Sequence, residues 1–462
     1  MLKNNVDSQA KPAFSENILR FLLVFFLVIP PLVFMPGSFK GQWIFTEYRE
    51  SKLAALLIIF WALATCFSFF FLDKHIQQIK RLARSAPIIL LSFLSFYSAL
   101  TTAWSTVPEA ALYESVQWIS FTFMFLIFVC LFKEKKFLEI AIYSIICAFA
   151  MVTFIGIFQT FKEIPFLMPI SGTKYGSTFG SKNACFLSFG SQLFLLFFIF
   201  WKSLDEKKIS YIFCAGSCII LELIYIAISL SRTAYAAIAI GMIALLFCTL
   251  VIVPKNKRNS IYKGAGFFLL VIFAITLLAQ QVYPKSWNIA KQRISHRMIP
   301  LILHPQNFFY KTARGQLIHD TCAMIKDHPL GVGAGNWPFL YPLYYNRLAQ
   351  KGFNRKKQIR KVHNDYIQYL AELGFPGFLA FIGLLFLSFK KLLSCIRHKT
   401  CGFHEKAFAA CLTAQLVAVA IMLFFSFYLE FPYRKFLFVF LLSLIYTLPS
   451  YERAKISFTP TS

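Results

Sequence analysis

Long apolar blocks alternate with short polar connections along most of the chain, and each block is about as long as a transmembrane helix. A transmembrane β-barrel would show short segments of alternating polarity instead. Twelve apolar spans are found near residues 18–36, 53–72, 86–104, 115–132, 137–161, 184–201, 209–229, 233–253, 264–282, 367–389, 407–429 and 435–449. The pattern therefore predicts an all-α polytopic membrane protein with about 12 transmembrane helices.

Composition agrees with this prediction and narrows the class of protein. Of the 462 residues, 58% are hydrophobic and 15% are charged, against about 45–50% and 25% in a typical soluble protein. These values exclude a soluble enzyme, a secreted disulfide scaffold and a nucleic-acid-binding domain, so no nucleic acid is expected as a partner. The net charge of +27 therefore needs a membrane explanation.

Lysine and arginine are concentrated in alternate connections, at 73–85, 133–136, 202–208, 254–263 and 390–406, whereas 105–114 contains neither. Because cytoplasmic loops collect these residues, both termini are predicted to be cytoplasmic. The chain then divides into four parts. They are 1–282 with nine transmembrane helices, a large periplasmic loop at 283–366, 367–450 with three more helices, and a cytoplasmic tail at 451–462.

The large loop is basic although it lies on the outer side. It contains fourteen Lys and Arg but only three acidic residues, and such a surface suits an anionic ligand such as a pyrophosphate or an acidic glycan. The alternative for the run 351–361 is a solvated face that rests on anionic lipid headgroups. Apolar residues at helical spacing predict a short helix over 313–327, which ends at His328-Pro329, and a tight glycine turn follows at 331–335.

Three basic side chains are candidates for chemistry: Arg232 at the outer end of the eighth span, Arg314 in the predicted loop helix, and His363 at the end of the loop. Each also has a simpler interpretation. Arg232 snorkels to the interface, Arg314 is one of many solvated charges, and His363 is structural. Asn364 or Asp365 is expected to cap the next helix, whose N-terminus then favours an anion.

Two further pairs of residues lie on the outer side. Lys182 and Asn183, before the sixth span, either contact the substrate or cap a helix. Glu430 and Arg434 lie four residues apart in the last outer turn. They form either an ion pair that closes the site or an exposed pair of little consequence, and the second interpretation is favoured.

The sequence His363-Asn364, nine residues and Gly374-x-x-Gly377 resembles the signature of the O-antigen ligase and polymerase superfamily. The two glycines are also expected to provide a small face for close helix packing. Matching stretches occur at 179–183, 231–235 and 314–336, so the resemblance covers about residues 170–390 well. The chain is most similar to the O-antigen ligases, which are bacterial membrane glycosyltransferases that use polyprenyl-pyrophosphate-linked glycans.

The resemblance implies a fold of the GT-C type, a site in the large periplasmic loop, and catalytic roles for His363, Arg314 and Arg232. It also implies a glycosyl transfer that inverts the anomeric configuration and uses no metal or other cofactor. The residue types agree with this chemistry. Arginine is always charged and binds phosphate bidentately, and histidine can act as a base near neutral pH or bind phosphate as an imidazolium. The acids of the loop form no Asp-x-Asp pair that would suggest a metal.

The function expected from these features is transfer of a glycan from a polyprenyl-pyrophosphate donor to an acceptor hydroxyl at the periplasmic face of the bacterial inner membrane. Lipid A-core is the favoured acceptor, and Asn364, Lys182 and Asn183 are expected to bind substrate together with the two arginines. A polysaccharide polymerase and a protein O-oligosaccharyltransferase share the same motifs. An alternative of another class is a lipid-linked sugar transporter or flippase, for which repeated halves and polar residues near the midplane would be expected.

Overall fold

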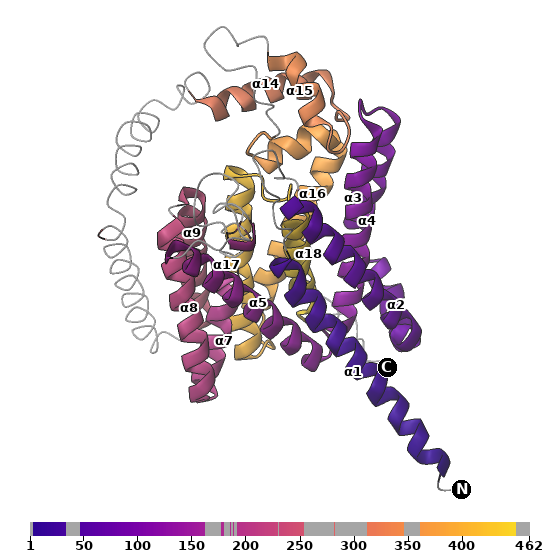
Figure 1. Ribbon diagram of the computed structural model, residues 1–462, viewed down its shortest axis with the longest axis vertical. Helices are drawn as coiled ribbons and strands as arrows, with labels where there is room; N and C mark the ends of the chain where they lie inside the picture. Colours follow the sequence, from indigo (N-terminus) through magenta and orange to yellow (C-terminus); the bar gives the residue numbers. More distant parts are fainter. Residues whose placement is uncertain are drawn as a thin grey trace, which may run out of the picture.

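The computed structural model describes residues 3–33, 47–161, 177–179, 185, 188, 192–229, 231–253, 281, 312–345 and 361–449. Over these residues the regular elements are helices, with no strand among them (Figure 1). The long helices are α1 (Lys3–Leu32), α2 (Glu47–Ala83), α3 (Ala86–Leu100), α4 (Pro108–Leu131), α5 (Lys135–Phe161), α7 (Leu193–Asp205), α8 (Ile209–Ser229), α9 (Arg232–Ile252), α16 (Asp365–Arg397), α17 (Phe403–Phe425) and α18 (Pro432–Thr447).

Nine helices in the described part of the chain are long and apolar enough to cross a membrane. Two shorter helices, α7 and α18, fall on the predicted spans 184–201 and 435–449. The all-α polytopic membrane fold is therefore confirmed. The predicted span 264–282 lies outside the described residues except at 281.

The lysine-rich connections that the structure describes, 73–85, 133–136, 202–208 and 390–406, lie together at one end of the bundle. Lys202 of α7 pairs with Glu139 of α5 at 3.0 Å, and His404 of α17 lies 3.2 Å from Asp205 of α7. The two loop helices α14 (Ala313–Asp327) and α15 (Trp337–Tyr345) lie at the opposite end, far from the N-terminus (Figure 1). This separation agrees with the expected alternation of loops, and the side that faces the cytoplasm stays a prediction.

The short loop helix was predicted with the bounds that the structure gives to α14. It begins after Thr312, whose side chain accepts a hydrogen bond from the Gly315 N–H at 3.0 Å, and it ends at His328. Helix α15 packs on α14 through buried aromatic side chains that donate to polar groups of α14. These bonds join Trp337 to Thr321, Tyr341 to Asp320 and Tyr344 to Asp327 at 3.0–3.1 Å. The two helices therefore form one small unit, whose core also includes Val332, Val362 and Ala371.

Candidate functional site

The turn at 329–336 is hydrogen-bonded to helix α16 at Gly374, where the backbone of the helix is not helical. Gly374 has a φ of +60°, and the Phe375 N–H after it donates to the Pro329 carbonyl at 3.1 Å. A Cβ on Gly374 would lie 2.3 Å from the Leu330 carbonyl carbon, so only glycine admits the turn here. The expectation of a small face for helix packing was wrong. Gly374 contacts the backbone of the turn at residues 329–331, not another helix. A Cβ on Gly377 would contact the Leu373 side chain of its own helix.

The same turn is tied to the connection between α3 and α4. The Trp104 indole N–H donates to the Gly331 carbonyl at 2.9 Å. The Asn336 side chain accepts from the Val107 N–H at 2.7 Å and donates back to the Val107 carbonyl at 3.1 Å. The glycines of the predicted turn, Gly331, Gly333 and Gly335, all have positive φ. The loop helices are thus fixed to the membrane helices by backbone and side-chain hydrogen bonds.

His363 lies immediately before helix α16 and has a φ of +64°. Asn364 caps this helix, because its side-chain oxygen accepts from the Ile367 N–H at 3.1 Å, as the sequence predicted. The His363 ring meets the Phe427 ring edge to face, with centroids 4.8 Å apart. Burial, together with the positive charges of Arg314 and Lys361, lowers the pKa of His363 to about 4.

Arg314 lies in the first turn of α14 and reaches the same place. Its exposed guanidinium donates from Nη1 to the Phe425 carbonyl at 3.3 Å. Phe425 ends α17, and Phe427 follows two residues later beside His363. We call Arg314, His363, Phe425 and Phe427 the mouth cluster. The structure thus brings together two of the three residues for which a catalytic role was predicted.

The backbone places Arg232 at the same end of the molecule. Arg232 begins α9, which runs antiparallel to α17, and a Cβ on Gly241 of α9 would lie 3.0 Å from the Ala414 carbonyl of α17. Because each helical residue rises about 1.5 Å, the first turn of α9 is level with the last turn of α17. The Arg232 side chain lies outside the described part of the chain, as do Lys182 and Asn183.

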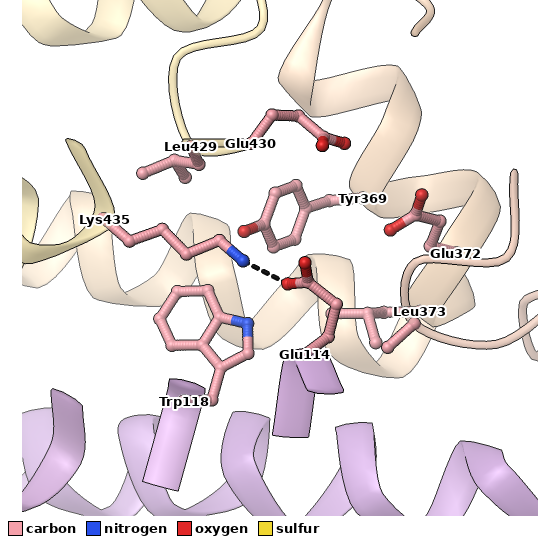
Figure 2. A pocket seen from close by; sticks show the side chains of 9 residues that line it. Glu114, Trp118, Tyr369, Glu372, Leu373, Leu429, Glu430 and Lys435 are labelled. Atoms are coloured by element: carbon pink, nitrogen blue, oxygen red, sulfur yellow. Dashed lines mark hydrogen bonds and ion pairs between the residues drawn. The ribbon is translucent and has the colours of Figure 1, made fainter. Parts of the chain in front are cut away.

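A second polar group surrounds a narrow cleft between α4, α16 and α18 (Figure 2). We call Glu114, Gln368, Glu372, Glu430 and Lys435 the cleft cluster. Figure 2 shows Lys435 reaching Glu114 across the cleft, with which it forms an ion pair. Glu372 accepts from the Gly335 N–H at 2.9 Å and from the Gln368 amide at 3.0 Å. Gln368 also donates to Glu430, so its amide joins two of the three acids, Glu372 and Glu430.

Sequence reasoning missed the cleft cluster, although one signal for it was present. Glu372 and Lys435 are charges within apolar helices, where an ionisable residue is costly unless it has a partner. The favoured interpretation of Glu430 and Arg434 as an exposed pair was wrong. Glu430 pairs with Lys361, whereas Arg434 is fully buried, with its guanidinium carbon 4.1 Å from the Phe431 ring centroid.

Comparison with known proteins gives one family match. Residues 217–382 match the family model described as O-antigen ligase. No curated protein is similar enough to the chain to match it. The matched segment contains Arg232, Arg314 and His363 together with the turn and helix break described above. The match supports a membrane glycosyltransferase of the ligase or polymerase type, since residues 217–382 are similar to the O-antigen ligase superfamily.

Proposed function

We propose that the protein transfers a glycan from a polyprenyl-pyrophosphate donor to a hydroxyl group of lipid A-core, at the end of the bundle that carries α14. The observation that carries this proposal is the convergence of Arg314 and His363 on residues 425–427, within a segment that matches O-antigen ligase. Arg314 and Arg232 bind the diphosphate in this proposal. Fixed positive charges at a developing diphosphate stabilise the transition state strongly in a partly desolvated site.

His363 is the proposed base. Its low pKa keeps the imidazole neutral at pH 7, as a base must be before it accepts a proton. The acceptor oxygen attacks the anomeric carbon of the donor sugar, and the bond to the diphosphate oxygen breaks with inversion. The acceptor proton passes to His363, and the bond electrons leave with the diphosphate. A bound diphosphate offsets the charge of Arg314 and so raises the pKa of His363 at the moment of reaction.

Transfer by the purified full-length protein in lipid nanodiscs tests the proposal. The donor is offered together with lipid A-core, a second lipid-linked glycan or a serine-rich protein, in separate reactions. We expect product on lipid A-core, with a loss of about 100-fold or more in His363→Ala. His319→Ala is the matched control, because His319 lies on α14 with a side chain that is 52% exposed.

Each other outcome rejects a stated part of the proposal. Product on the second lipid-linked glycan alone indicates a polymerase, and product on the protein alone indicates an oligosaccharyltransferase. Donor binding without product on any acceptor favours a transporter. Activity that is lost in chelator and restored by Mg²⁺ or Mn²⁺ overturns the expectation of metal-independent chemistry.

A further inference from the structure

Helix α15 has apolar residues on both of its faces. Trp337, Tyr341 and Tyr344 are buried against α14. On the opposite face Phe339 is exposed and Leu343 is 72% exposed. The nine residues of the helix carry no charged side chain. A helix that lies on a protein surface in water normally has a polar outer face, so the outer face of α15 requires an apolar environment.

The turn that precedes α15 carries an exposed apolar residue at the top of a lipid-facing stripe. Leu330 is 59% exposed, and its neighbour Pro329 accepts from the N–H of Phe375, which is also exposed. The stripe continues down α16 through the exposed side chains of Leu379 and Phe386. Leu330 therefore extends the surface that α16 presents to the acyl chains.

The length of α16 sets the height of this turn in the membrane. Lys390 marks the polar end of the apolar stretch at the far side. About 20 helical residues cross a hydrocarbon core of about 30 Å, so counting back from Lys390 reaches the neighbourhood of residue 370. Phe375, which lies about 22 Å from Lys390 at about 1.5 Å per residue, and the turn beside it are thus in the outer part of the hydrocarbon region, close to its boundary with the headgroups. Trp104 is partly exposed at the same turn and donates to Gly331, as expected of an aromatic residue at this boundary.

We propose that the outer face of α15, formed by Phe339, Pro342 and Leu343, lies in the headgroup boundary of the adjacent leaflet together with Leu330. The occupant of this face is lipid, because the turn that leads into α15 adjoins a lipid-facing stripe near the membrane boundary and the face lacks charge. The loop unit is thereby held at the surface from two directions, by α16 and by the lipid. This inference does not depend on which reaction the protein catalyses.

Photocrosslinking in vesicles of phosphatidylethanolamine and phosphatidylglycerol tests this surface. The photoreactive residue benzoylphenylalanine replaces Leu343 in the full chain, and lipid adducts are measured by mass spectrometry after illumination. Phe386, which is exposed on α16, provides the positive control position. Lys326, which is exposed in the last turn of α14, provides the control in water.

We expect the yield of lipid adduct at position 343 to approach that at 386 and to exceed that at 326 by about tenfold. A yield at 343 as low as at 326 overturns the proposal. Adducts at 343 with protein in place of lipid also overturn it, since they show that another part of this chain or a second copy covers the face. A parallel substitution at Phe339 should give the same result as position 343, because both side chains lie on the outer face of α15.

Discussion

The mouth cluster and the cleft cluster lie at the same end of the molecule, but their charges are balanced in different ways. In the cleft, Glu114 pairs with Lys435, and Glu372 accepts hydrogen bonds from Gly335 and Gln368. In the mouth, Arg314 is exposed, whereas Lys361, the other positive charge that lowers the pKa of His363, pairs with Glu430. A cluster that neutralises itself stabilises a fold, whereas an exposed positive charge suits an anionic ligand. The comparison predicts that substitutions in the two clusters affect different measurements.

The largest expected effect on folding comes from Glu114→Ala. The substitution leaves the Lys435 ammonium buried without its carboxylate partner, which costs about 3–5 kcal/mol of stability. Thermal unfolding in detergent should show a lower Tm, and Glu109→Ala in the exposed first turn of α4 should not. The double variant Glu114→Gln with Lys435→Met should recover part of the loss. An unchanged Tm with lost transfer would instead make the cleft a binding site.

Arg314→Ala should act on transfer and leave folding intact. Removal of the guanidinium from the proposed diphosphate site is expected to reduce transfer about 100–1000-fold. Because the Arg314 side chain is exposed, the Tm should stay near that of the wild type. The transfer rate of Arg314→Lys should lie between those of the wild type and Arg314→Ala, since an ammonium keeps the charge but not the bidentate geometry. An equal loss of transfer in Lys326→Ala, on the same helix, would contradict a specific role for Arg314.

Gly374→Ala should affect both clusters. The turn that packs on Gly374 also includes Gly335, whose N–H donates to Glu372. The new Cβ would strain a positive φ and collide with Leu330, at an expected cost of about 2 kcal/mol. Gly383→Ala in the same helix is the control. Its Cβ would lie 3.4 Å from the Leu90 side chain, and a helical alanine should not destabilise. Similar Tm values for the two variants would show that the turn does not depend on the helix break.

The smallest expected effect is on the pH dependence of transfer. With a His363 pKa near 4 in the free protein, kcat/KM for transfer should stay nearly constant from pH 7 to about pH 5 and fall as the pH passes through 4. In the unfolded chain His363 binds a proton below about pH 6.5, whereas in the folded protein it does so only near pH 4. The contribution of His363 to the free energy of unfolding is therefore complete above about pH 6.5 and is lost as the pH falls toward 4. His363→Ala should remove this contribution to acid sensitivity. Transfer that rises on acidification below pH 7 would indicate that His363 binds phosphate as an imidazolium.

The sequence by itself determined what depends on near neighbours in the chain. Hydropathy fixed the membrane helices, because each span must bury its own backbone polar groups. Apolar periodicity and the proline rule located both ends of α14, and capping preferences placed the cap of α16 at Asn364 or Asp365, of which the structure shows Asn364. The motifs around Arg314 and His363 indicated the superfamily whose family model matches residues 217–382, because a short signature can be recognised without knowledge of its contacts.

Only the tertiary structure decided which distant residues meet. Glu114 and Lys435 lie 321 positions apart, and Arg314 reaches Phe425 across 111 positions. The partner of Glu430 and the role of Gly374 were predicted wrongly for the same reason, since each depends on a segment that packs from elsewhere in the chain. Sequence spacing carries the periodicity of one helix, whereas a contact between helices depends on how all of them pack.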